Sequence, residues 1–217
     1  MKLIHLDALF FIVEFLGVFA GALSGGLSAI RHPHYKYDWV GVLGLAFVAA
    51  LGGGITRDVI LQHGVPLAFN DVRYILISLG GALVAIVFEH RMGPRVDRGI
   101  DVVDAAALGF FAIAGTTRAL NDGLNVMSSI LLGLVTAVGG GSLRDVLCGR
   151  TPHVFERGQL YAIAALCGSA TFLLCNALEL HRATSTIVGT LTCFLVRLLS
   201  VRYNWRTEHI RGRAALS

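Results

Sequence analysis

Residues 52–59 of this chain read GGGITRDV, and residues 139–146 read GGGSLRDV. Three glycines, an arginine, an aspartate and a valine recur at the same places, 87 positions further along (139 − 52 = 87). The match extends outward: Tyr74 falls on Tyr161 and, after a one-residue gap, Pro66 falls on Pro152. Such self-similarity at a fixed spacing indicates an internal duplication.

The composition indicates a membrane protein. Of the 217 residues, 55% are hydrophobic and 15% are charged, and the mean hydropathy is +0.70. Soluble domains carry about 25% charged residues, so this chain has too few polar side chains to cover a water-exposed surface. The net charge of +4 is not gathered on a polar, basic face, which excludes nucleic acid as a partner.

Polar and glycine- or proline-rich stretches divide the chain into seven apolar segments, each of about the length that a membrane-spanning helix needs. The segments cover residues 8–30, 39–61, 72–88, 102–120, 124–148, 158–178 and 183–201. Irregular backbone cannot face lipid, so we predict an all-α membrane protein with seven transmembrane helices. The glycine triplets are expected to interrupt the second and fifth of them.

The duplicated unit contains three helices, an odd number, so its two copies must cross the membrane in opposite directions. We predict two inverted three-helix repeats and a C-terminal helix, a plan that places the functional path near the repeat interface. The expected parts are a first repeat at 6–90, a second at 100–180, a seventh helix at 183–203 and a basic cytoplasmic tail at 204–217.

Lysines and arginines favour one side of this plan. Eleven of them share a side with the C-terminus, namely Arg31, Lys36, Arg91, Arg95, Arg98, Arg150, Arg157, Arg202, Arg206, Arg211 and Arg213. Four belong to the other side, namely Lys2, Arg73, Arg118 and Arg182. The excess of positive charge on cytoplasmic loops predicts an outer N-terminus and a cytoplasmic C-terminus, in a bacterial or archaeal plasma (inner) membrane.

The glycine triplets are the first candidate functional feature. Three glycines within a spanning helix are costly, at roughly 1 kcal/mol each relative to alanine, and exposed backbone is tolerated only where it lines a cavity or packs on protein. Close packing of two helices through small residues is the alternative. The expected pore or hinge residues are Gly52, Gly53, Gly54, Gly139, Gly140 and Gly141, with hydroxyls of Thr56, Thr136 and Ser142 near the centre.

The charges that follow each triplet are the second feature. Arg57 with Asp58, and Arg144 with Asp145, stand about a turn beyond the glycines. A charge near membrane depth costs at least a few kcal/mol, which favours a gating or pore-lining role. A neutral pair that fixes one helix against another is the alternative. Arginines alone would repel a cation, so a cation path requires that they be paired.

Other charged positions give weaker signals. Asp104 is expected to cap the start of the fourth helix, and Glu14 lies inside the first helix without a symmetric partner. Arg118, near the end of the fourth helix, would extend its head group toward the interface or contact a lipid phosphate. Arg197 in the last helix would do the same or sense voltage.

The sequence has no enzyme signature. The glycine segments lack the spacing of dinucleotide-binding loops and the lysine of phosphate-binding loops. The four cysteines and eight histidines form no metal-ligand pattern, so we expect neither a metal nor a cofactor, only transported ions.

The doubled GGGxxRDV motif, followed by Pro66 and by Pro152-His153-Val154-Phe155, resembles bacterial members of the trimeric intracellular cation (TRIC) channel family. That family is also known as a duplicated domain named for glycine transport. The resemblance covers about residues 6–180. It implies a homotrimer with a pore in each protomer that conducts K+ and, to a lesser extent, Na+, with the second and fifth helices bent at their glycines.

We therefore expect a K+-permeable channel whose pore lies between the second and fifth helices and is gated by voltage or by anionic lipid. A secondary transporter of a small zwitterion such as glycine is the alternative, because inverted repeats equally suit alternating access. A lipid-binding or purely structural membrane protein is a third possibility.

Overall fold

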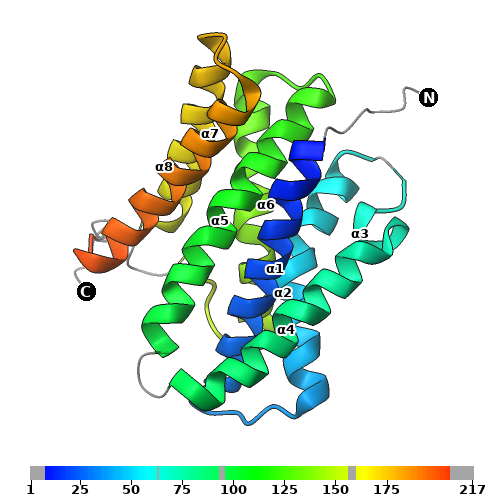
Figure 1. The fold of residues 1–217 in the computed structure, drawn as a ribbon, viewed down its shortest axis with the longest axis vertical. Coiled ribbons are helices and arrows are strands. Elements are labelled where there is room, and N and C mark those ends of the chain that lie inside the picture. The colour runs from blue at the N-terminus through cyan, green and yellow to red at the C-terminus, as the bar shows by residue number, and fades with distance from the viewer. Residues whose placement is uncertain (1–7, 63, 93–95, 156–159, 206–217) are drawn as a thin grey trace, which may run out of the picture.

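A computed structural model describes residues 8–62, 64–92, 96–155 and 160–205, and these form eight helices (Figure 1). The helices are α1 Ala8–Ile30, α2 Trp39–Ile60, α3 Leu67–Asn70, α4 Val72–Met92, α5 Val96–Asn121, α6 Val126–Leu147, α7 Tyr161–Ala177 and α8 Arg182–Arg202. The seven predicted helices are confirmed. Helix α3, a single turn that follows Pro66, was not predicted from the sequence.

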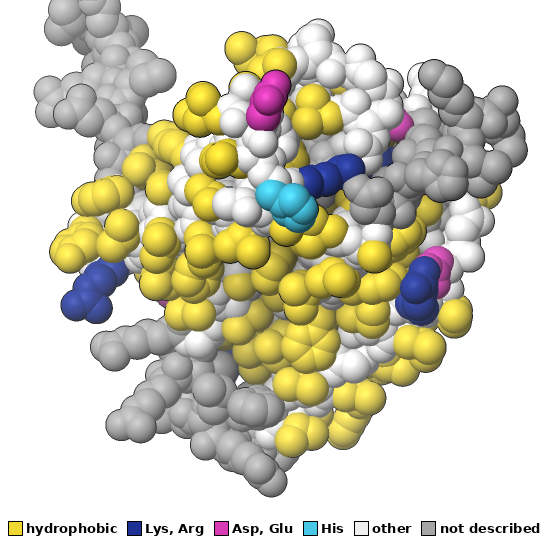
Figure 2. All heavy atoms as spheres, turned by 45° about the horizontal axis from the view of Figure 1, so that its top comes forward, with side chains coloured by type: hydrophobic (Ala, Val, Ile, Leu, Met, Phe, Trp, Pro, Cys, Tyr) yellow, Lys and Arg dark blue, Asp and Glu magenta, His cyan; other side chains and the backbone are white. Residues whose placement is uncertain are grey.

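The lengths and surface of the helices suit a bilayer. Helices α1, α2, α6 and α8, and residues 99–121 of α5, are long and apolar enough to cross a membrane. Two shorter apolar stretches, 72–87 in α4 and 161–177 in α7, complete the seven. Figure 2 shows hydrophobic side chains over much of one face, with charged side chains only at scattered points. The chain is an all-α integral membrane protein.

The two repeats are inverted. Helices α1, α2 and α4 form the first repeat, and α5, α6 and α7 form the second. Figure 1 shows α1 running down from the end of the molecule near the N-terminus, whereas α5 runs up toward that same end. Corresponding residues of the two repeats therefore lie toward opposite ends of the molecule.

The seventh transmembrane helix, α8, breaks this symmetry. In the first repeat, Gly81 of α4 packs on α1, because a Cβ at Gly81 would lie 2.7 Å from the carbonyl oxygen of Phe19. Its equivalent Gly168 packs on α8 instead, where a Cβ would lie 2.6 Å from the Cβ of Cys193. Helix α8 thus occupies, beside α7, the place that α1 occupies beside α4.

The expected interruption of two helices is wrong. Both α2 and α6 continue as α-helix through their glycine triplets. The physical reason is that the triplets face one another: a Cβ at Gly53 would overlap the carbonyl oxygen of Thr136, and one at Gly140 would overlap that of Ala49. The glycines let two helix backbones approach closely, which is the packing alternative.

Candidate functional site

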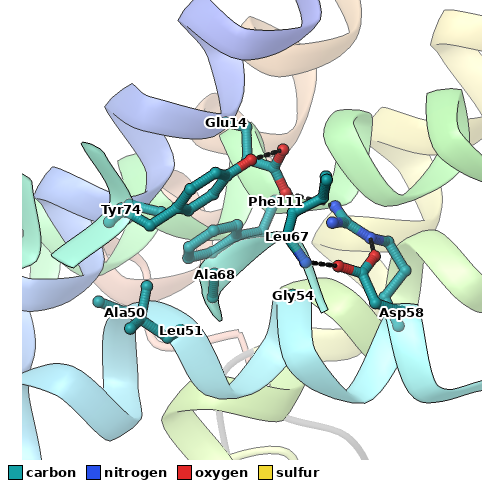
Figure 3. Close-up of a pocket in the computed structure, with 11 residues that line it drawn as sticks. Glu14, Ala50, Leu51, Gly54, Asp58, Leu67, Ala68, Tyr74 and Phe111 are labelled. Atoms are coloured by element: carbon teal, nitrogen blue, oxygen red, sulfur yellow. Dashed lines mark hydrogen bonds and ion pairs between the residues drawn. The ribbon is translucent and has the colours of Figure 1, made fainter. Parts of the chain in front are cut away.

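The first of two buried charge clusters surrounds Arg57 near the end of α2. Its guanidinium group is 2.6 Å from the carboxylate of Glu14 in α1 and 2.8 Å from that of Asp58. The hydroxyl of Tyr74 in α4 donates a hydrogen bond of 2.6 Å to Glu14 (Figure 3). Arg57 and Glu14 are both only 1% exposed, so this cluster joins three helices of the first repeat inside the protein.

Asp58 also makes a second interaction, with the segment after α2. Its other carboxylate oxygen accepts a hydrogen bond of 2.9 Å from the backbone N–H of Leu67, the first residue of α3 (Figure 3). In the second repeat, Asp145 accepts a hydrogen bond of 3.3 Å from the backbone N–H of His153. Each aspartate of the repeated motif therefore fastens the segment that follows its helix, directly after Pro66 or Pro152.

The second cluster surrounds Arg144 near the end of α6. Its guanidinium group is 2.7 Å from Asp145 and 3.7 Å from Asp104 of α5. Ser24 of α1 bridges the cluster, because its hydroxyl donates to Asp104 at 3.2 Å and accepts from Arg144 at 3.4 Å. Arg144 is 4% exposed, so this arginine is also held inside the protein by two carboxylates.

The acidic partners that two other helices supply to the arginines were not predicted from the sequence. Asp104 was expected at a helix start, but α5 begins at Val96, which places Asp104 within the helix. Glu14 was expected to lack a counterpart, but Asp104 takes the same place beside its arginine. The two acids are 90 positions apart (104 − 14 = 90), which is three residues, or slightly less than one helical turn, more than the spacing of the motif. A comparison at the fixed spacing of 87 therefore does not align them.

The tyrosines of the two clusters could have been predicted from the sequence. Tyr74 and Tyr161 coincide at the 87-residue spacing (161 − 74 = 87), yet neither was considered a site residue. In the second cluster, the ring of Tyr161 also lies beneath the guanidinium group of Arg197 in α8, at 4.6 Å. Among the described residues, α8 contributes no equivalent charge to the first cluster, so the two sites differ in charge.

A narrow cavity adjoins each cluster. The first chamber, as we call the cavity lined by Glu14, Gly54, Arg57, Asp58 and Tyr74, lies toward the end of the molecule at which α1 begins. The second chamber is lined by Gly21, Asp104, Gly141, Arg144 and Tyr161 and lies toward the end at which α5 begins. Each has room for about one water molecule.

The six motif glycines fall into two groups: four pack at the helix crossing, and two face a chamber. Gly52, Gly53, Gly139 and Gly140 lie at the crossing of α2 and α6, where a Cβ on any of them would meet the other helix. The third glycine of each triplet faces its own chamber instead. A Cβ at Gly54 would lie 3.8 Å from a carboxylate oxygen of Glu14, and one at Gly141 would lie 3.4 Å from the hydroxyl of Tyr161.

The remaining predicted residues line neither chamber. Thr56 donates its hydroxyl to the carbonyl of Gly52 in its own helix, at 2.7 Å, and Ser142 is partly exposed. Thr136 likewise donates to Leu132, at 2.7 Å. Arg118 is 4% exposed in the last turn of α5.

Comparison with known proteins agrees with this architecture. The glycine transporter family matches residues 11–90 and 101–177, one stretch for each repeat. The chain belongs to this family. Its curated relatives include UPF0126 membrane proteins of Deinococcus radiodurans (37% identical over 163 residues, 75% of this chain and 74% of the relative) and Streptomyces coelicolor (39% over 191 residues, 88% and 86%). The UPF0126 inner membrane protein YadS of Escherichia coli is 29% identical over 195 residues, 88% of this chain and 91% of YadS.

Solved structures connect this glycine transporter family member to TRIC channels. The TRIC trimeric intracellular cation channel orthologue from Rhodobacter sphaeroides superposes with a TM-score of 0.83 at 30% identity, over 91% of this chain and 99% of that one. A second structure, solved to establish the structural basis for conductance through TRIC cation channels, superposes with a TM-score of 0.81 at 31% identity. The superposition covers 95% of this chain and 99% of that one. The predicted resemblance is confirmed: the chain has the TRIC fold and is homologous to cation channels rather than to enzymes.

Proposed function

We propose that this family member is a K+-permeable monovalent cation channel with one pore in each protomer. The observation that carries the proposal is the charge balance of the first cluster, in which Glu14 and Asp58 together face the single cation of Arg57. One negative charge is left in excess at a site from which water is largely excluded. In such low-dielectric surroundings, that charge attracts a passing cation strongly and repels an anion.

This balance removes the difficulty that arginines pose for a cation path. Each motif arginine is held between two carboxylates and faces the chamber as part of an ion-paired group rather than as a free charge. In the second cluster, Arg197 offsets the excess negative charge. We therefore assign the stronger attraction for cations to the first chamber.

The proposed path runs from one chamber to the other beside the crossing of α2 and α6. The first chamber lies against the end of α2 and the second against the end of α6, so inversion of the repeats places one at each end of the path. Gly54 and Gly141 keep side chains out of the two chambers. The present conformation is closed, because a chamber with room for about one water molecule does not pass a hydrated ion.

The assembly and orientation are further parts of the proposal. The trimeric state of the Rhodobacter sphaeroides orthologue supports a homotrimer. The inner-membrane location of YadS supports a plasma (inner) membrane. The excess of lysine and arginine on one side supports an outer N-terminus and a cytoplasmic C-terminus.

Gating by voltage or by lipid is proposed on the basis of Arg118. This side chain is buried near the end of α5, and its Nε atom has no hydrogen-bond partner within the described part of the chain. A phosphate oxygen of an anionic lipid would supply the missing acceptor. The positive charge of the same side chain would respond to a membrane potential.

Planar-bilayer recording tests the proposal. Purified protein in asymmetric KCl should give unitary currents whose reversal potential lies near that of K+, with smaller currents when Na+ replaces K+. The absence of unitary currents at both signs of voltage would contradict a channel.

A secondary transporter of a small zwitterion such as glycine is the second candidate. It is favoured by one observation: the two chambers face opposite ends of the molecule and offer carboxylates and an arginine to the two charges of a zwitterion. Saturable uptake of glycine into proteoliposomes, without unitary currents, would select this alternative.

A further inference from the structure

The ring of Phe111, in the middle of α5, lies between the two chambers. It lines the first chamber together with Val18 and Ala50, and it also lines the second together with Leu108 (Figure 3 shows its place in the first). Phe111 is 4% exposed. It is therefore the apolar partition that separates two sites bearing charged side chains.

The ring is closely packed on α1. A Cβ at Gly17 would lie 3.1 Å from the ring of Phe111, and a Cβ at Gly21 would lie 3.2 Å from it. Two glycines one turn apart thus form the surface against which the ring rests. Any larger residue at either position would push the ring aside, so α1 has room for this aromatic side chain and for little else.

Phe111 also departs from the symmetry of the repeats. The 90-residue spacing that relates Glu14 to Asp104 places Gly21 opposite Phe111 (111 − 21 = 90). The same spacing relates Gly25 to Gly115, which pack on equivalent residues of α2 and α6. At the centre of the molecule, one repeat thus contributes a glycine and the other a phenylalanine that fills the space against it.

We propose that Phe111 is the gate of the ion path, a hydrophobic barrier that an ion must pass between the two chambers. This inference rests on the proposed channel function. Between the charged side chains of the first chamber and those of the second, the lining side chains are apolar, chiefly Phe111, Val18 and Leu108. Narrow apolar constrictions stop ions by expelling water, and rotation of one aromatic ring away from the path would let water return.

The test replaces Phe111 by alanine and compares it with a matched control. Phe172→Ala removes the same side chain from an equally buried position, 1% exposed, where α7 packs on α8 at Gly189 and away from both chambers. In bilayers containing K+, Phe111→Ala should raise the open probability several-fold, whereas Phe172→Ala should leave it unchanged. Equal gating of Phe111→Ala and wild-type protein would overturn the proposal.

A second measurement separates this inference from the channel function itself. Ala107 is buried and lines the second chamber. A cysteine at this position, Ala107→Cys, is treated with a membrane-impermeant cationic thiol reagent from the side at which α1 begins, with the parent protein as background. Labelling should become faster in the Phe111→Ala background. If wild-type protein does not conduct, the proposed function is refuted, but the labelling rate can still be measured. If Phe111→Ala does not change the labelling rate, Phe111 is not the barrier.

Discussion

Arg57 and Arg144 show how single residues keep a full charge at membrane depth. Each arginine is buried and is held by two carboxylates from two helices, so neither has to be desolvated alone. Removing one member of such a group leaves a buried charge without compensation, which is far more destabilising than the pair itself is stabilising. Substitutions in the first cluster should therefore show which of its charges affect ion permeation and which affect the stability of the fold.

The first prediction concerns the excess charge. Glu14→Gln keeps the size of the side chain and a hydrogen-bonding group for Tyr74, but it removes the negative charge that remains after Arg57 and Asp58 are paired. Unitary K+ conductance and selectivity for cations over anions should both fall, as measured by currents and reversal potentials in asymmetric KCl.

The control for this variant is Asp71→Asn. Asp71 pairs at 2.6 Å with Arg73, whose side chain is 58% exposed at the surface, so this substitution removes the same charge away from both chambers. Its conductance should match that of wild-type protein. Equal conductance of Glu14→Gln and Asp71→Asn would contradict a role of the first cluster in attracting ions.

The second prediction concerns stability. Arg57→Ala leaves Glu14 and Asp58 buried without their cation and should lower the free energy of unfolding by roughly 3–5 kcal/mol. The double variant Arg57→Ala/Glu14→Gln should recover part of this loss, because only one buried carboxylate then remains. Thermal unfolding in detergent measures both. A double variant less stable than Arg57→Ala would show that the pairing does not govern stability.

At the scale of helices, the crossing of α2 and α6 replaces the broken helices expected from the glycine triplets. The middle glycine of each triplet contacts the backbone of the other helix, so the low helix propensity of glycine is compensated by close packing. The third glycine of each triplet keeps a chamber open. One short motif therefore builds both the helix contact and the wall of the proposed path.

A third prediction follows for the crossing. Gly53→Ala places a methyl group against the carbonyl oxygen of Thr136 and should force the helices apart, lowering the unfolding temperature and the yield of folded protein. Gly80→Ala is the matched control, since a Cβ there meets nothing within 4 Å. Alanine favours a helix over glycine by about 1 kcal/mol, so the control should be neutral or stabilising. Similar stability of the two variants would contradict close packing at Gly53.

The loop between α1 and α2 gives a fourth prediction, on pH. The Nδ1 atom of His32 accepts hydrogen bonds from the backbone N–H groups of Tyr35, at 3.0 Å, and His34, at 3.3 Å, which requires a neutral ring. Burial, and then the positive charge of Arg150, lower the pKa of His32 below its ordinary value. In the unfolded chain the ring takes up a proton near pH 6.5, whereas the folded protein resists it.

The stability contributed by His32 is therefore complete above about pH 7 and declines as pH falls through about 6.5. Unfolding temperatures between pH 8 and pH 5.5 should show this decline, and His32→Gln should reduce it. His34→Gln, an exposed neighbour in the same loop, is the control. A decline of the same size in His32→Gln and wild-type protein would assign the pH dependence to other groups.

At the scale of the whole molecule, inversion of the repeats places similar clusters at opposite ends, and α8 makes them unequal. Helix α8 packs beside α7 and brings Arg197 over the ring of Tyr161 in the second cluster. Phe111 adds a second asymmetry at the centre. A path with unequal charge at its two ends should pass ions unequally in the two directions.

The fifth prediction concerns the assembly. If each protomer of a homotrimer contains its own pore, currents from single trimers should show three equal conductance steps. Trimers assembled from wild-type and Glu14→Gln chains should then combine large and small steps in one particle. A single step whose size changes gradually with composition would indicate instead one pore shared by the three chains.

The sequence by itself determined the membrane class, the seven helices, the duplication and its inversion. These follow from local hydropathy, from self-similarity and from an odd number of helices, none of which depends on how side chains pack. The same reasoning identified Arg57, Asp58, Arg144 and Asp145, because charge inside an apolar run is visible without a structure.

Only the tertiary structure decided what these residues contact. Glu14 and Asp104 join the arginines from other helices, at a spacing offset from that of the motif, and Phe111 meets Gly21 across the interface between the repeats. The continuity of α2 and α6 depends on the same kind of contact, since glycines that weaken a lone helix strengthen a close crossing. Packing geometry in three dimensions determines which residues far apart in the chain come into contact, and a local sequence pattern carries no information about those contacts.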